Sequence, residues 1–131
     1  MSWTYRCPHC RVLLDPHEAI ILRAAHAGTR ILAGFHPEPG NYEIYFPPDV
    51  DLRDGQRWDF FCPVCQADLV SQENENLCAL EFQRGEETSR ILFSRIAGEK
   101  ATYVLAEGTV KERHGEHAQS YFEFLMSYRL F

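Results

Sequence analysis

Two short motifs place four cysteines at a spacing typical of metal binding. Cys7-Pro-His-Cys10 and Cys62-Pro-Val-Cys65 share the form Cys-Pro-x-Cys. Two residues between the cysteines allow a tight turn that points both sulfurs toward one ion, and the proline fixes φ within that turn. The two turns, called knuckles below, together offer four thiolates to one tetrahedral ion. We therefore predict that Cys7, Cys10, Cys62 and Cys65 bind a single metal.

The predicted site is structural, because four protein ligands complete a tetrahedral shell and leave no position for water or substrate. Zinc is the expected ion. Iron is the closest alternative, since the same four thiolates serve both metals. Iron knuckles of the rubredoxin kind usually carry glycine after the second cysteine, where this chain has Arg11 and Gln66. This difference favours zinc.

The residues around the knuckles are repeated as well. An aromatic residue stands two positions before each first cysteine (Tyr5 and Phe60), and a leucine stands four positions after each second cysteine (Leu14 and Leu69). The paired motifs resemble the zinc-ribbon class over about residues 5–14 and 60–69. This resemblance implies two knuckles at the ends of β-hairpins that share one zinc ion. It selects no single function, because the class serves transcription factors, ribosomal proteins, enzyme subunits and adaptors.

The remaining sequence predicts a mainly β fold. Residues 11–61, between the knuckles, exceed the length of a compact ribbon and predict a β-rich insert. Its expected strands are residues 19–25, 29–35, 42–46 and 56–61. Residues 15–18 (Asp-Pro-His-Glu) also fit the start of a helix that Gly28 would end. The sequence therefore leaves residues 19–28 open between helix and strand, and their isoleucines favour strands.

Beyond the second knuckle, a polar loop at residues 71–76 precedes three expected strands, at residues 77–82, 90–97 and 101–106. The last two form a hairpin with apolar residues on both faces, so both faces should pack against other residues. In the aromatic residues 116–131, apolar positions fit both helical and strand spacing. No glycine or proline interrupts this length, which favours a C-terminal helix over a strand. We expect residues 1–70 to form the zinc-ribbon-like module. Residues 71–131 would form the hairpin and aromatic segment, packed on that module.

Composition and charge bound the possible partners. The chain has 131 residues, 45% of them hydrophobic, which is typical of a folded domain, and its formal net charge is −6. This acidic balance disfavours nucleic acid, because binding to the phosphate backbone needs clustered cations. Apolar stretches fall short of the roughly 20 residues that span a bilayer, and no signal peptide precedes Cys7. We expect a cytoplasmic protein without membrane association.

Other residues that could do chemistry offer weaker patterns. Cys78 lies among apolar neighbours and is interpreted as a core residue, with a reactive thiol as the alternative. His114 and His117 could hold a second metal, but surface exposure is the simpler interpretation and Gly115 disfavours a helix there. No nucleophile elbow, phosphate-binding glycine loop or dinucleotide fingerprint occurs. We therefore expect no enzyme.

These observations favour a non-catalytic, zinc-stabilised protein that acts as a protein-binding adaptor, an accessory subunit or a homo-oligomeric module. Its interface would use the apolar hairpin and the aromatic C-terminal segment. The alternative is a nucleic-acid-binding zinc-ribbon regulator, in which aromatic residues beside cations, such as Trp3 and Arg6, would stack on bases. The sequence does not identify the partner.

Overall fold

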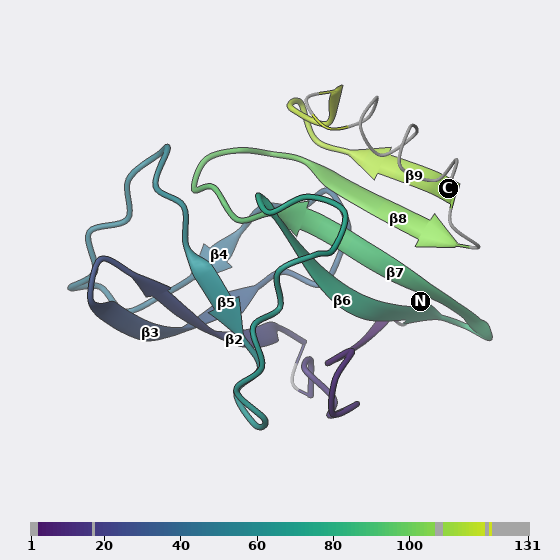
Figure 1. Cartoon of the computed structure of the whole chain (residues 1–131), viewed down its shortest axis with the longest axis horizontal. Helices are drawn as coiled ribbons and strands as arrows, with labels where there is room; N and C mark the ends of the chain where they lie inside the picture. The colour runs from purple at the N-terminus through teal and green to yellow at the C-terminus, as the bar shows by residue number, and fades with distance from the viewer. Residues whose placement is uncertain (1–2, 17, 107–108, 120, 122–131) are drawn as a thin grey trace.

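The protein is built from two antiparallel sheets (Figure 1). The computed structural model describes residues 3–16, 18–106, 109–119 and 121, and nine strands lie within them. In Figure 1 the blue strands β2 to β5 lie on one side of the molecule and the green and yellow strands β6 to β9 on the other. The mainly β fold predicted from the sequence is therefore confirmed.

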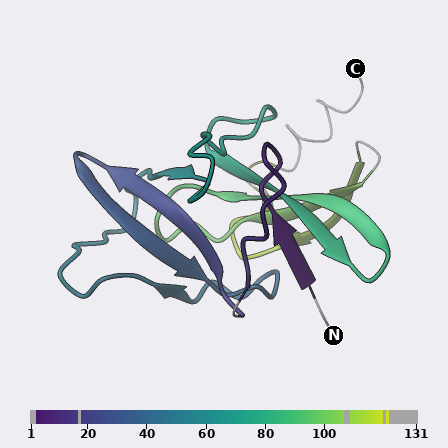
Figure 2. The ribbon, with the colours of Figure 1, turned by 90° about the horizontal axis from the view of Figure 1, so that it is seen from below.

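The larger sheet has the order β1-β6-β7-β8-β9. Its strands are β1 (Trp3–Arg6), β6 (Leu77–Arg84), β7 (Glu87–Ser94), β8 (Thr102–Ala106) and β9 (Thr109–His114). The first strand of the chain thus joins strands that come some 70 residues later, with Tyr5 opposite Phe82. Figure 2 shows this N-terminal strand beside the green strands of the larger sheet.

Both faces of the larger sheet are apolar, as the alternating sequence predicts. Leu80 and Ile91 face the smaller sheet and belong to the main core. Leu92 and Tyr103 face the opposite side and form a second cluster with Ala118. The Tyr103 hydroxyl donates a hydrogen bond to the Ala118 carbonyl, which fastens the chain after β9 to this second face.

The smaller sheet has the order β4-β3-β2-β5. Its strands are β2 (Ile20–His26), β3 (Thr29–Phe35), β4 (Ile44–Tyr45) and β5 (Asp59–Phe61). The turn between β2 and β3 places Ala27 and Gly28 at φ values of 49° and 85°, the left-handed conformation that suits two-residue hairpin turns. The preferred strand prediction for residues 19–28 is confirmed, and the helical alternative is wrong because β2 pairs on both edges.

Aromatic side chains fill the space between the two sheets. The rings of Phe35 and Phe60 lie 5.4 Å apart edge to face, and Phe93 lies 5.9 Å from the first and 6.0 Å from the second. Phe35 and Phe60 come from the smaller sheet and Phe93 from the larger one. The main core therefore holds the sheets together by apolar burial, the dominant favourable term in folding.

Some elements differ from the sequence-based expectations. Strand β9 was not predicted, because its residues (Thr-Val-Lys-Glu-Arg-His) are mostly polar and it lies at the edge of the sheet. The predicted helix at residues 116–131 lies mostly outside the described residues and stays a prediction. The division at residue 70 also stays a prediction, and β1 pairs with β6 across it.

Among the described residues, no helix is long and apolar enough to cross a bilayer.

Gly115 gives a test of how the chain after β9 is held. Its φ is 101°, and a Cβ atom there would lie 2.2 Å from the Lys100 carbonyl oxygen and 2.5 Å from the Tyr42 hydroxyl. At Gly28 φ is 85°, and a Cβ would meet no atom within 4 Å. We expect Gly28→Ala to lower the free energy of unfolding by about 1–2 kcal/mol, the cost of the left-handed conformation.

Gly115→Ala should cost about 1–3 kcal/mol more than Gly28→Ala, because it adds a steric clash to the same backbone penalty. Urea denaturation of both variants measures the difference. Equal losses of stability would contradict the close approach of Gly115, Lys100 and Tyr42.

Candidate metal centre

The first knuckle lies at the end of a short hairpin that begins with β1. The Leu14 N–H donates to the Tyr5 carbonyl at 2.8 Å, and the Cys7 N–H donates to the Val12 carbonyl at 3.1 Å. Within the turn, the N–H groups of His9 and Cys10 donate to the Cys7 sulfur at 3.3 and 3.4 Å. Such bonds stabilise a thiolate, so the turn prepares Cys7 for a metal.

The second knuckle repeats this geometry, starting from β5. The Leu69 N–H donates to the Phe60 carbonyl at 2.9 Å, and the Cys62 N–H donates to the Ala67 carbonyl at 3.1 Å. The Val64 and Cys65 N–H groups each donate to the Cys62 sulfur at 3.4 Å. The repeated residue types in the sequence therefore correspond to two copies of one local structure.

The four predicted ligands converge on one point. The Cys7 and Cys65 sulfurs lie 3.8 Å apart, and the Cys10 and Cys62 sulfurs lie 3.7 Å apart. All four sulfur atoms lie within 4.8 Å of one another. A tetrahedral ion with bonds of about 2.3 Å holds its sulfurs about 3.8 Å apart, whereas a disulfide needs about 2.05 Å. The spacing therefore fits a metal ion, and the cluster could hold one.

The two cysteines of each knuckle differ in exposure in the same way. Cys7 and Cys62, the first of each pair, are 0% exposed, whereas Cys10 and Cys65 are exposed. The buried pair faces the core and the exposed pair faces solvent. An ion bound here would lie just below the surface, with access from the side of Cys10 and Cys65.

The protonation of the buried thiols depends on their surroundings. Burial raises the pKa of Cys7 to about 12, although the Cys10 and His9 N–H groups lower it. Burial also acts to raise the pKa of Cys62, but hydrogen bonds from the Cys65 and Val64 N–H groups and from neighbouring sulfurs outweigh it. The result is a pKa lowered to about 7. At both buried sulfurs the N–H groups of the knuckle therefore act against burial and favour the thiolate that a metal binds.

Each knuckle hairpin has one arm on each sheet. The first begins in β1, which pairs with β6, and its returning arm reaches β2 through the Ile21 N–H, which donates to the Leu14 carbonyl at 2.8 Å. The second begins in β5, which pairs with β2, and its returning arm reaches β6 through the Ala79 N–H, which donates to the Leu69 carbonyl at 2.8 Å. The sulfur cluster thus lies at the junction of the two sheets.

Arg11 and Gln66 follow the second cysteine of each knuckle and adopt the left-handed conformation, with φ values of 69° and 64°. Their N–H groups donate to the Cys7 and Cys62 carbonyls at 2.9 and 3.0 Å. The turn therefore requires the conformation that glycine adopts at least cost, although glycine is absent. The absence of glycine at these positions therefore no longer favours zinc over iron, because Arg11 and Gln66 adopt the backbone conformation that glycine would adopt there.

The remaining candidate residues lie away from the sulfur cluster. Cys78 is fully buried in β6 and burial raises the pKa of its thiol, which confirms the core interpretation. His114 Nε2 forms a hydrogen bond with Glu112 Oε1 at 3.1 Å, and His117 Nδ1 accepts a hydrogen bond from the Lys100 N–H at 2.9 Å. Among the described residues, the four cysteines form the one group of three or more possible ligands within bonding reach of a single ion.

Sequence reasoning missed one residue that supports the first knuckle. Asp15 is the first residue of the segment that also fits the start of a helix. In the structure its carboxylate accepts the Tyr5 N–H at 2.9 Å and closes the base of the hairpin. Burial raises the pKa of this carboxyl, although the Tyr5 N–H lowers it. An aspartate directly after Leu14 was the sequence signal for this contact. It is equally typical of a helix N-cap, so the residue type alone did not distinguish the two roles.

The left-handed position in the second knuckle can be tested by substitution. We expect Gln66→Gly to raise the free energy of unfolding by about 0.5–1 kcal/mol, because relief of the left-handed strain exceeds the entropy that glycine adds to the unfolded chain. Ala67→Gly, next to it and without a positive φ, should lower stability by up to about 1 kcal/mol. Chemical denaturation measures both, and a loss of stability in Gln66→Gly would contradict the turn geometry.

Comparison of the chain with protein-family models, with curated proteins and with solved structures finds no match.

Proposed function

We propose that Cys7, Cys10, Cys62 and Cys65 hold one structural zinc ion, and that the protein is a non-catalytic, zinc-stabilised protein-binding module. It would act as an adaptor, an accessory subunit or a self-associating unit. The observation that carries the proposal is the pairing of the four sulfurs at 3.7 and 3.8 Å, at the junction of the two sheets. Four thiolates saturate a tetrahedral ion, so the ion would stabilise the fold and leave no open position for a substrate.

Zinc is proposed over iron because closed sites of four cysteines are typical of structural zinc. Zinc also has no redox chemistry, which suits a site whose exposed sulfurs, Cys10 and Cys65, would bring iron close to solvent. Tetrahedral sulfur ligands also fit iron. The purified protein distinguishes the two, since an iron–thiolate centre is coloured and a zinc centre is not.

The hairpin of β7 and β8, which the sequence predicts as part of the interface, is instead buried on both faces, with Ile91 in the main core and Leu92 in the second cluster. A face of the smaller sheet supports the protein-binding part of the proposal. On the outer face of the smaller sheet, Leu32 and Tyr45 are 55% and 47% exposed. A Cβ atom on Gly34 would lie 3.3 Å from the Tyr45 ring and 3.6 Å from the Ile21 side chain, so these two flank one position of the face. Leu32 shares that face by alternation. We call the half-buried Ile21 and the exposed Leu32 and Tyr45 the outer-face patch. Grouped apolar residues at the surface are typical of protein interfaces.

The zinc proposal predicts one zinc ion per chain and a fold that depends on it. Cys62→Ser should lose the zinc and unfold at a markedly lower temperature, because binding of structural zinc contributes free energy to folding. Cys78→Ala, a matched change outside the cluster, should keep one zinc per chain. Elemental analysis and thermal unfolding by circular dichroism measure these outcomes. Full zinc content and unchanged melting in Cys62→Ser would refute the proposal.

The binding proposal predicts association through the outer-face patch. Wild-type protein should sediment as a concentration-dependent oligomer, or cross-link to one defined partner through this face. Leu32→Glu should weaken that association at least about tenfold, because the interface would lose apolar contact and have to remove water from a carboxylate. Thr29→Glu, exposed in the same strand, should leave the association unchanged.

A monomer at all concentrations that cross-links to no partner would refute the binding proposal. Salt-dependent binding to RNA or DNA would instead support the nucleic-acid alternative, against the net charge of −6.

A further inference from the structure

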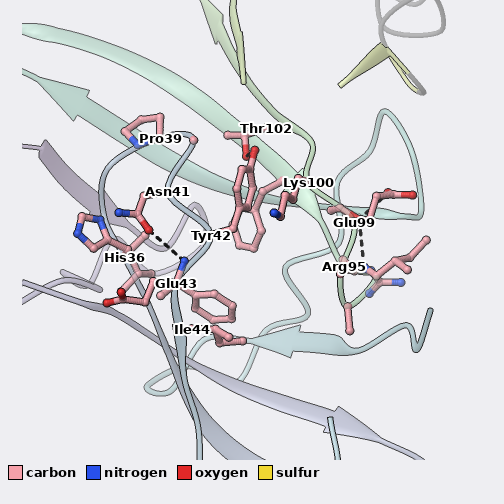
Figure 3. A pocket seen from close by; sticks show the side chains of 18 of the residues that line it. His36, Pro39, Asn41, Tyr42, Glu43, Ile44, Arg95, Glu99, Lys100 and Thr102 are labelled. Atoms are coloured by element: carbon pink, nitrogen blue, oxygen red, sulfur yellow. Dashed lines mark hydrogen bonds between the residues drawn. The ribbon is translucent and has the colours of Figure 1, made fainter. Parts of the chain in front are cut away.

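A cavity of about 310 Å³ lies between the two sheets, and none of the four clustered cysteines lines it. Its lining comes from the smaller sheet through Phe35, Ile44 and Phe60, and from the larger sheet through Ile91 and Phe93. The loop after β3, which includes Tyr42, and the turn before β8 complete its rim. In Figure 3, Asn41 of the loop and Lys100 of the turn lie on opposite sides of Tyr42. A volume of this order suits a small organic molecule.

The inner wall of the cavity is apolar and aromatic. Phe35, Phe60 and Phe93 lie within 6.0 Å of one another by ring centroids, and they line one end of the space. Aromatic faces contribute large apolar contact area, and they attract a cation held over the ring. The wall would therefore accept the apolar body of a ligand.

The rim of the cavity is acidic. Four carboxylates line it (Glu38, Glu43, Asp54 and Glu99), together with the cations Arg95 and Lys100. With His36 taken as neutral, four carboxylates and two cations give the lining a formal net charge of −2. An acidic rim of this kind raises the local concentration of cations and repels anions.

The two lining cations are already paired with carboxylates outside the lining. Arg95 Nη1 lies 3.1 Å from Asp59 Oδ1, and Lys100 Nζ lies 3.8 Å from Glu116 Oε1. Their charge is therefore partly compensated by residues that do not face the cavity. The rim carboxylates determine the sign of the field that a ligand would meet.

Hydrogen bonds fix the rim in place. The Tyr42 hydroxyl lies 2.7 Å from Thr102 Oγ1 and donates to the His114 carbonyl at 3.0 Å. These bonds join the loop after β3 to the larger sheet, and Figure 3 shows Tyr42 and Thr102 in contact. A rim ordered before binding reduces the entropy that a ligand must lose on binding.

We propose that this cavity binds a small organic cation: a primary amine on an aromatic or branched apolar body. The body would contact Phe35, Phe60 and Phe93, and the ammonium would lie at the rim near Glu43 and Glu99. This site includes none of the four clustered cysteines and does not depend on the protein-binding proposal.

A matched series of ligands tests the charge preference. 2-Naphthylmethylamine, 2-naphthylmethanol and 2-naphthoic acid share one aromatic body and differ in the charge of the head group. Isothermal titration calorimetry on the full chain should show the amine binding at least about tenfold more tightly than the acid, with the alcohol between them. Added salt should weaken binding of the amine and leave the affinity for the alcohol unchanged. Equal affinities, tightest binding of the acid, or no binding would overturn the proposal.

Substitutions then locate the site. Glu43→Gln combined with Glu99→Gln should weaken binding of the amine about threefold to tenfold and leave binding of the alcohol unchanged. The glutamine amide oxygen can still accept the hydrogen bonds that Tyr45 donates to Glu43 and that Ser94 and Tyr121 donate to Glu99, so the main change is the loss of negative charge. Glu87→Gln, an exposed carboxylate in β7 outside the cavity, is the control and should change neither. An equal effect of the control and the double variant would overturn the assignment of the rim.

A cavity-filling variant provides an independent check. Ile44→Trp should abolish binding of both the amine and the alcohol, since the larger side chain would occupy the space. Thr29→Trp, at an exposed position of the neighbouring strand β3 and outside the cavity, should leave binding intact. Thermal unfolding establishes that each variant is folded. Undiminished binding in a folded Ile44→Trp protein would place the ligand elsewhere and refute the proposal.

Discussion

The convergence of four sulfurs at one point is the constraint on which the architecture depends. Each knuckle hairpin has one arm hydrogen-bonded to β6 of the larger sheet and the other to β2 of the smaller one. The two hairpins cross between the sheets in opposite directions and meet at the cysteines. The relative position of the sheets is therefore coupled to the distances among four sulfur atoms, which an ion would fix.

Local sequence signals predicted the two knuckles and the convergence of their four cysteines. The two Cys-Pro-x-Cys motifs, with Tyr5 and Phe60 before them and Leu14 and Leu69 after them, predicted a unit used twice, and the hydrogen bonds of the two knuckles agree within 0.1 Å. The hairpin of β2 and β3 was also predictable, because β-branched residues flank a turn ending in glycine. These features depend on neighbouring residues alone.

Features set by distant pairing were not predictable in the same way. The edge strand β9 is polar and is recognised only through its pairing with β8. The left-handed conformation of Gln66 is imposed by the knuckle against the preference of its residue type. The cavity arises where two sheets face each other, and its lining is spread from Tyr5 to Thr102. A single sequence carries no local signal for such arrangements.

The crossing of the knuckle hairpins also constrains the order of assembly. Cys7 and Cys65 are 58 residues apart, and β1 has no partner strand until β6 has been synthesised. As the chain leaves the ribosome, Cys7 and Cys10 are therefore present before Cys62 and Cys65, the other two sulfurs of the cluster. Closing such distant contacts is slow. The complete four-sulfur site can form only after the second knuckle has been made, so a metal would be captured late, when the two sheets close together.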